Sequence, residues 1–196
     1  LIANYYLRYG PNDVLDQAQF TPWDEGAHRE RRVVMLGTPS LGAVTSLERL
    51  QTGYLDFYKV IHSVTWEQYE RFYPVLRQEV QKAKDQGLIR HVIYSVHDSP
   101  ENIMRLVETQ EFEGMLLQYN LLDRANEDAI ARAHELGMGV GVMGPVGGGR
   151  LGMQSERLAE LVPGAASTPE LALRVVLANP NVTIAFSGMN TAEQIR

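Results

Sequence analysis

The feature that most constrains the fold is a regular alternation of short, β-branched runs with longer amphipathic stretches. Strands are predicted at 33–36, 54–60, 91–95, 114–119, 139–143 and 182–186. Helices are predicted at 66–86, from Ser99-Pro100 onward, at 126–136, at 171–177 behind a Thr168-Pro169-Glu170 cap, and from Thr191 to the last residue. Because successive strand–helix units favour parallel strands joined by right-handed crossovers, the chain is predicted to be an α/β protein.

Two architectures fit this alternation, a doubly wound open sheet and a (β/α)8 TIM-type barrel. A complete barrel typically needs about 250 residues, and the chain has 196. We therefore predict one domain over 1–196, an incomplete barrel of about six βα units that lacks its first strands and its last helix. Residues 19–32 and 37–46 are predicted loops, and Trp66, Tyr69, Phe72 and Tyr73 are predicted to form one packing face.

Composition narrows the class of protein. The chain has 18 basic and 24 acidic residues, a net charge of −6, and no cysteine. An acidic balance without a basic run predicts no nucleic-acid partner. The absence of cysteine excludes disulfides, thiol catalysis and cysteine-bound metal within this chain, and no metal site is predicted. No apolar run reaches the roughly 18–20 residues of a membrane span, and no signal peptide is visible, so a cytoplasmic protein is predicted. Nothing in the composition indicates an oligomeric state.

Two segments are candidates for anion binding. The glycine-rich stretch from Gly144 to Gly152 follows a predicted strand, and backbone amides of glycine can approach a phosphate closely. The segment from Ser187 to Asn190 lies between the last strand and a helix start, where the helix N-terminus attracts anions. A flexible turn and a capped turn are the alternatives for these two segments.

Several side chains are candidates for proton chemistry. His62 is expected just after the strand that ends at Val60, and His97 just after the strand that ends at Ser95. Tyr6 and Tyr9 lie in a tyrosine-rich N-terminal segment, and a tyrosine acts as a general acid when a nearby cation lowers its pKa. Surface histidines and simple aromatic packing are the alternatives.

Taken in order, several strings resemble the aldo-keto reductases, particularly the bacterial branch that often carries an iron–sulfur tail. They are SLERLQTGYLDFYKVIHSV, KAKDQGLIRHVIYSVHDSPENI, QYNLLDR, MGPVGGGRLG and SGMNTAEQI. The resemblance is clear over 47–196 and loose over 1–46. It implies a (β/α)8 barrel that uses NADPH to reduce a small-molecule carbonyl substrate, without a dinucleotide-binding domain of the Rossmann type.

The resemblance also implies cofactor contacts. Those along the adenosine phosphate would be Ser187, Gly188, Met189, Asn190 and Gln194. Gly147, Gly148 and Arg150 would lie near the pyrophosphate. Ser95 would face the nicotinamide amide, and Tyr119 would stack on the nicotinamide ring.

The family's catalytic Asp, Tyr, Lys and His match this chain only in part. Tyr6 is the preferred acid, with Leu1 at the Asp position; Tyr9 is the alternative, with Asn4 at that position. Thr38 stands where the Lys is expected.

The histidine position of the family falls at Ile61, one residue before His62. The family's glutamine falls at Leu116, and Gln118 is expected on the opposite strand face. The catalytic set is therefore predicted to be incomplete, with a non-catalytic cofactor-binding barrel as the alternative. A phosphate-binding lyase or isomerase would need a strand-end lysine, and Lys59 is expected mid-strand.

Overall fold

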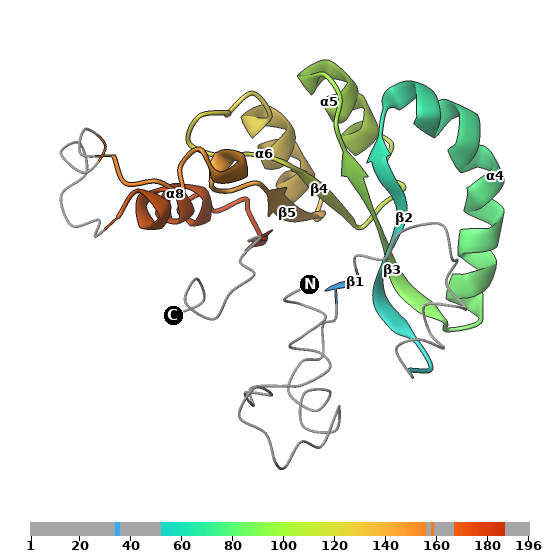
Figure 1. The fold of residues 1–196 in the computed structure, drawn as a ribbon. Helices are drawn as coiled ribbons and strands as arrows, with labels where there is room; N and C mark the ends of the chain where they lie inside the picture. Colours follow the sequence, from blue (N-terminus) through green and yellow to red (C-terminus); the bar gives the residue numbers. More distant parts are fainter. Residues whose placement is uncertain (1–33, 36–51, 156–157, 159–166, 187–196) are drawn as a thin grey trace, which may run out of the picture.

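The computed structural model describes residues 34–35, 52–155, 158 and 167–186. These residues form one six-stranded sheet in which every adjacent pair is parallel. The strands are β1 (Val34–Met35), β2 (Leu55–Val64), β3 (Ile89–Val96), β4 (Gly114–Gln118), β5 (Gly139–Met143) and β6 (Ile184–Ala185). Their spatial order is also their sequence order (Figure 1).

That order decides between the two predicted architectures. A doubly wound sheet must reverse its strand order at a switch point, whereas this sheet adds each new strand on the same side. The prediction of an incomplete barrel is therefore confirmed. In the described part of the chain, β1 and β6 are the two outer strands and do not pair with each other, so the barrel is open.

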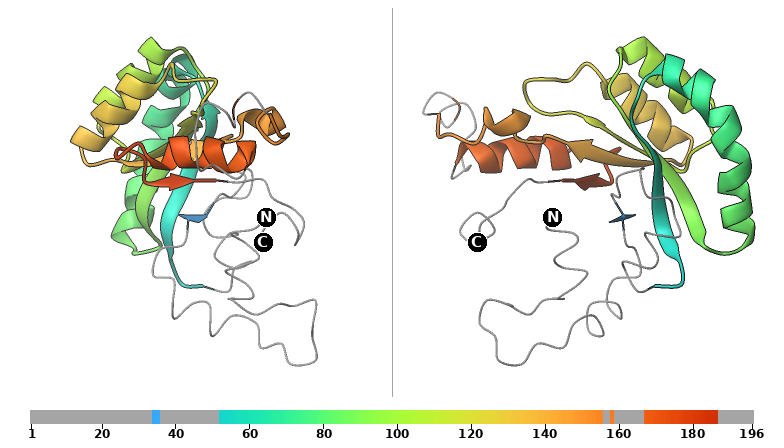
Figure 2. Two further views of the ribbon diagram at one scale, coloured as in Figure 1. Left: turned by 90° about the vertical axis from the view of Figure 1, so that its left-hand side faces the viewer. Right: turned by 45° about the vertical axis from the view of Figure 1, so that its right-hand side comes forward.

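Four α-helices accompany the described strands: α4 (Trp66–Asp85), α5 (Pro100–Glu108), α6 (Glu127–Glu135) and α8 (Thr168–Leu177). Figure 2 shows α4, α5 and α6 on one face of the curved sheet, which we call the outer face. The opposite, inner face corresponds to the inside of a barrel. The core between sheet and helices is almost fully buried and includes Val92, Tyr94, Leu106, Val107, Leu117, Ile130, Val140 and Val142.

Local hydrogen bonds explain where the helices begin. The Thr65 hydroxyl accepts the Gln68 N–H, and the Gln68 side chain accepts the Thr65 N–H, which forms a capping box at α4. Ser99 caps α5, as predicted. The cap of α8 is Ser167, whose hydroxyl accepts the Glu170 N–H at 3.3 Å. The predicted cap, Thr168, is instead the first residue of the helix. Pro169 fits the first turn whether the cap is Ser167 or Thr168, so the sequence did not distinguish the two.

Strand lengths also depart from prediction. β2 runs four residues beyond the predicted end at 60, so His62 lies inside the strand and not after it. β6 contains only Ile184–Ala185 of the predicted 182–186. The second difference is expected of an outer strand, since it has a neighbour on one side only.

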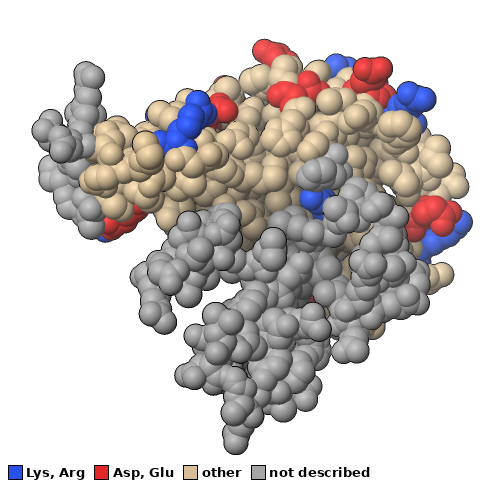
Figure 3. All heavy atoms as spheres, in the orientation of Figure 1, with Lys and Arg blue, Asp and Glu red and all other residues tan. Residues whose placement is uncertain are grey.

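The outer surface of the helices carries interspersed charges (Figure 3). Arg132 bonds Glu108 at 2.6 Å and Glu135 at 3.1 Å, so it links α6 to α5. Arg124 pairs with Glu127 at 2.7 Å at the start of α6. Exposed pairs of this kind contribute little to stability. The fold therefore depends mainly on the apolar layer beneath them.

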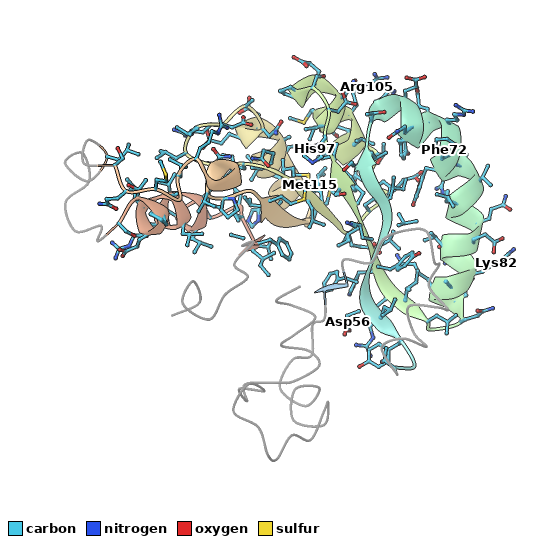
Figure 4. All side chains as sticks on the ribbon, viewed as in Figure 1. Asp56, Phe72, Lys82, His97, Arg105 and Met115 are labelled. Carbon is cyan, nitrogen blue, oxygen red and sulfur yellow. The ribbon has the colours of Figure 1, made fainter. Side chains whose placement is uncertain are left out.

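An aromatic cluster joins α4 to the sheet. Phe112 is 4% exposed, and its ring centroid lies 4.6 Å from those of Tyr73 and Tyr94 and 6.2 Å from that of Tyr69. Burial raises the pKa of Tyr73 to about 12. The predicted packing face is thus confirmed for Tyr69 and Tyr73. It is wrong for Phe72, which is 48% exposed and carries Arg71 against its ring (Figure 4).

This cluster generates a stability test. Phe112→Ala is expected to lower the free energy of unfolding by about 3–5 kcal/mol, because it removes a ring buried among three others. Phe72→Ala is the matched control and is expected to cost less than about 1 kcal/mol. Urea denaturation followed by tryptophan fluorescence measures both changes. Equal losses for the two variants would contradict the assigned core.

Candidate functional site

The candidate site lies at the carboxyl-terminal edge of the sheet. All strands are parallel, so the residues that follow β3, β4 and β5 meet at this edge. They include Ser95 near the end of β3, Asn120 after β4 and the loop that begins at Gly144. In barrel enzymes this edge carries the active site, because the βα loops gather there.

Ser95 lies on the inner face of the sheet. Its neighbours Tyr94 and Val96 belong to the outer core, and Ser95 pairs across the ladder with Leu116, which lines the inner face. The Ser95 side chain is fully buried, and its hydroxyl accepts the Ser63 N–H at 2.8 Å. This hydrogen bond connects the ends of β2 and β3 at the edge.

Asn120 connects the next two loops. It is completely buried, its amide donates to the Gly144 carbonyl at 3.2 Å, and its carbonyl oxygen accepts the Leu122 N–H at 2.9 Å. Sequence reasoning did not single out Asn120. The available signal was its place inside the QYNLLDR string, directly after a strand, where a short polar side chain commonly holds a turn.

Gln118 packs directly against the start of the glycine-rich loop. Gly144 has φ = 62°, and a Cβ built there would lie 2.6 Å from the Gln118 amide nitrogen. Only glycine suits that position, for both its backbone angle and its space. Gln118 follows Leu116 by two residues and therefore shares its inner face. The prediction that Gln118 lies on the strand face opposite to Leu116 was wrong, because residues two apart in a regular strand point to the same side.

The loop itself is tightly wound. Gly147–Gly149 form a 3-10 turn, η3, and all three glycines have positive φ. The N–H groups of Gly147, Gly149 and Arg150 donate to carbonyls within the same loop. In this conformation those amides do not point to a ligand. Arg150 is exposed and its Nε donates to the Gly147 carbonyl at 3.2 Å, so its guanidinium is the group of this loop best suited to hold a phosphate.

Tyr119 lies on the other side of the sheet. It is 2% exposed and packs in the outer core with Met115 and Leu117. Its hydroxyl donates to Glu127 at 2.7 Å and accepts from the Asn179 amide at 3.5 Å. The predicted stacking of a nicotinamide ring on Tyr119 does not fit this position. Tyr119 is next to Gln118 in the sequence, but adjacent residues of a strand point to opposite faces of the sheet. Nearness in the sequence therefore did not place Tyr119 in the site.

The inner face below the edge is largely apolar. An open hollow of about 90 Å³ lies on this face toward the amino-terminal ends of the strands, and its lining includes Phe57, Ile93, Gly114, Leu116, Gly139, Gly141 and Phe186. Gly141 has no side chain, which leaves room for Phe186 and Leu116: a Cβ there would lie 2.9 Å and 3.2 Å from their side chains. Such a surface can accept a flat, weakly polar ring.

One charged group is buried in β2 close to this hollow. Lys59 is 7% exposed and pairs across the ladder with Ile93, which lines the hollow. Burial lowers the pKa of the Lys59 ammonium group below its ordinary value. Its position in mid-strand agrees with the expectation that it is not a strand-end lysine.

His97 and Asp98 follow β3 at the edge of the sheet. His97 is exposed (Figure 4). Burial acts to raise the pKa of Asp98, but hydrogen bonds from the Asn102 side chain and from the Trp66 and Ser99 amides outweigh it and lower that pKa. Asp98 therefore holds the first turns of α4 and α5 together, which is a structural role.

The remaining predicted residues lie outside the described part of the chain. They are Tyr6, Tyr9, Ser187, Gly188, Met189, Asn190 and Gln194, together with the Leu1, Asn4 and Thr38 positions. His62 is described by its backbone alone. Of the predicted set, the structure thus brings Ser95, Gly147, Gly148 and Arg150 to one edge and separates Tyr119 from them. In the described ranges, no three histidine or acidic side chains form a metal-binding group, and no helix could cross a membrane.

Comparison with known proteins identifies the class of barrel. The model of the Aldo/keto reductase family matches residues 43–196, most of the chain. This chain belongs to the aldo/keto reductase family. An uncharacterized oxidoreductase of Bacillus subtilis strain 168, YrpG, is 25% identical over 182 residues, which cover 77% of this chain and 54% of that protein.

Solved structures agree with the family. Aldo-keto reductase AKR11C1 of Bacillus halodurans, in its holo form, has a TM-score of 0.64 and 26% identity, over 78% of this chain and 55% of that one. Its apo form gives 0.65 and 27%, over 78% and 58%. The glycerol dehydrogenase AKR11B4 of Gluconobacter oxydans shares the fold, with a TM-score of 0.53 and 20% identity over 73% and 52%. This aldo/keto reductase chain spans about half the length of these relatives.

Asn120 gives a test of the edge of this aldo/keto reductase. Asn120→Ala is expected to lower the free energy of unfolding by roughly 1–3 kcal/mol, because the Leu122 N–H and the Gly144 carbonyl lose their buried partner. Asn102→Ala is the control, since the Asn102 side chain bonds only the half-buried Asp98 before α5 and the exposed Arg105 on α5 among the described residues, and it is expected to cost less. Chemical denaturation measures both. An Asn120→Ala variant with the same free energy of unfolding as wild type would show that Asn120 does not hold the two loops together.

Lys59 gives a pH test. A lowered pKa means that the unfolded chain holds the Lys59 proton more tightly than the folded chain does. Wild-type stability is therefore expected to rise with pH between that lowered pKa and the ordinary value of 10.5. Lys59→Met removes the ionisable group, so its advantage over wild type is expected to shrink as pH rises through this window. Urea titrations of both proteins from pH 7 to pH 11 measure the difference, and a difference independent of pH would contradict the assignment.

Proposed function

We propose that this chain carries the cofactor edge of an NADPH-dependent oxidoreductase that reduces a small carbonyl compound to an alcohol. The observation that supports it is the convergence of Ser95, Asn120 and the glycine-rich loop at the carboxyl-terminal edge of an in-order parallel sheet, in a chain of the aldo/keto reductase family. Loops after late barrel strands are the usual place for phosphate groups in this architecture.

The described residues fit such a cofactor in three respects. The exposed guanidinium of Arg150 suits a phosphate. The buried Ser95 hydroxyl suits an amide group at the inner face. The apolar Leu116 side chain, which pairs with Ser95 across the ladder, suits contact with a flat ring. Gly147 and Gly148 let the chain backbone approach closely, and Ser187, Gly188, Met189, Asn190 and Gln194 are proposed along the adenosine phosphate.

The proposed chemistry is a hydride and proton transfer. A tyrosine of this chain, Tyr6 or alternatively Tyr9, would donate the proton to the carbonyl oxygen, while the hydride for the carbonyl carbon would come from NADPH, giving the alcohol and NADP⁺. His62 would orient the carbonyl oxygen. Thr38 stands at the lysine position of the family pattern and carries no charge that could make the tyrosine a stronger acid, which predicts slow turnover.

A second function is supported by Leu116. This side chain is apolar and 2% exposed on the inner face, where the family's glutamine is expected. Leu116, like Thr38 and Ile61, replaces a residue of the family's site pattern. These three replacements favour a protein that binds the cofactor but does not reduce a substrate. A cytoplasmic location and the absence of nucleic-acid partners belong to both proposals.

A thermal melt of the full chain with NADPH tests the proposal. At 100 times the dissociation constant, a bound ligand adds about 2.7 kcal/mol to the stability of the folded state, which corresponds to roughly 5–10 °C for a chain of this size. Arg150→Gln is expected to weaken the binding of NADPH about tenfold, because it removes a charged contact. Arg124→Gln, on the outer surface, is the matched control.

The outcomes separate the functions. A shift with NADPH accompanied by loss of absorbance at 340 nm with small aldehydes supports the reductase. A shift without turnover supports the binding protein. A cooperative melt that NADPH does not move contradicts both.

A further inference from the structure

The glycine-rich loop leads to Gln154 and Ser155, and both of these residues are held by Thr168, the first residue of α8. The Thr168 hydroxyl accepts the Ser155 N–H at 2.7 Å, and the Thr168 N–H donates to the side-chain carbonyl of Gln154 at 3.1 Å. Thr168 is 2% exposed, so water has little access to its hydroxyl. Because the two hydrogen bonds run in opposite directions between the same two segments, they fix both the distance and the orientation of the loop end relative to α8.

Thr168 and its neighbour Ser167 have different roles at the start of α8. Ser167 closes its own helix, since its hydroxyl accepts the Glu170 N–H. The Thr168 N–H lies in the first turn, where helical N–H groups have no acceptor inside the helix, and Gln154 supplies one. The Thr168 hydroxyl bonds Ser155 instead of capping the helix. Removal of this hydroxyl should therefore release the loop end and leave the cap in place.

The other end of the loop is held from β4. The Asn120 amide donates to the Gly144 carbonyl at 3.2 Å, and Gln118 packs directly against Gly144. The loop is thus attached to β4 at its start and to α8 at its end. Two separate elements of the fold determine where its middle lies.

The middle of the loop depends on these attachments because it is rich in glycine. Gly147–Gly149 all have positive φ, and a Cβ added at either of the last two would meet nothing within 4 Å. Glycine allows the backbone more conformations than other residues do. Leu151, directly after the exposed Arg150, is 3% exposed, and its N–H donates to the Val146 carbonyl at 3.1 Å. The position of Arg150 therefore follows from the attached ends and from this buried residue.

We propose that Thr168 is a positioning residue for the phosphate group that Arg150 would bind. By holding Ser155, it limits the places that the Arg150 guanidinium can take. A loop that is ordered before binding loses less conformational entropy when its ligand binds, and binding is tighter for that reason. The inference rests on the proposed function for its ligand, whereas the hold of Thr168 on the loop is testable without any ligand.

Hydrogen exchange of the free chain tests this hold. Thr168→Val has nearly the same shape but no hydroxyl, and it is expected to speed exchange of the Ser155 and Leu151 amides by about tenfold or more. Thr168→Ser keeps the hydroxyl and is expected to leave both rates within about threefold of wild type. Ser167→Ala is the matched control, because it removes the cap of the same helix but neither hydrogen bond of Thr168. Equal acceleration in Ser167→Ala and Thr168→Val would overturn the proposal.

The Leu151 amide reports on the neighbourhood of Arg150. If Thr168→Val speeds exchange at Ser155 but not at Leu151, the hold is local and the proposal is wrong. Gln154→Ala removes the other hydrogen bond at an exposed position, and it is expected to speed Leu151 exchange about threefold. Should Thr168→Val lose its cooperative melt, a wild-type rate at Leu151 in Gln154→Ala would refute the positioning role.

Binding of NADPH to the full chain then tests the link to Arg150. Thr168→Val is expected to raise the Kd about fivefold in the wild-type background and less than about twofold when Arg150→Gln is also present, since both changes then act on one contact. Ser167→Ala is expected to change the Kd by less than about twofold in either background. An equal loss of affinity for Thr168→Val in both backgrounds would mean that Thr168 does not act through Arg150. A wild-type chain that does not bind NADPH would contradict the proposed function, whereas the exchange rates would still support or refute the hold of Thr168 on the loop.

Discussion

The in-order parallel ladder is the constraint on which the rest of the structure depends. Each strand bonds to the strand before it in the sequence, so all six carboxyl ends meet at one edge. The connecting helices must then lie on a single side, because a right-handed crossover returns each of them to the same face. The sheet therefore acquires two unlike surfaces, an outer face covered by helices and an inner face that carries the candidate site.

The division into two faces explains most individual residues. Tyr94 and Tyr119 are aromatic residues near strand ends, and both serve the outer core. Ser95, one residue from Tyr94, serves the inner face and the edge. The role of a side chain therefore depends on whether its position points to the outer or the inner face of the sheet, more than on its residue type. The register of β2 against β3 shifts twice near the edge, between Lys59 and Ile61 and again between Ile61 and Val64.

Much of the fold followed from local pattern. The helix 66–86 and the strands 114–119 and 139–143 were predicted to within one residue, because each combines a strong apolar period with a clear cap or stop. The strand predicted at 91–95 begins two residues earlier and ends one residue later. The cap at Ser167, the exposed Phe72 and the extension of β2 to Val64 were missed. In each case two local solutions are equally compatible with the sequence, and only packing against another element selects one.

Local sequence patterns were enough to predict the strand–helix alternation and the parallel class, and the family strings place the candidate residues near strand ends. Tertiary structure alone decided which face those residues take, that Asn120 joins the loops after β4 and β5, and that Tyr119 lies away from the candidate site. The physical reason is the range of the interactions. Caps and periodicity act within a few residues, whereas ladder register and the bonds from Ser63 to Ser95 and from Asn120 to Gly144 join residues more than 20 positions apart.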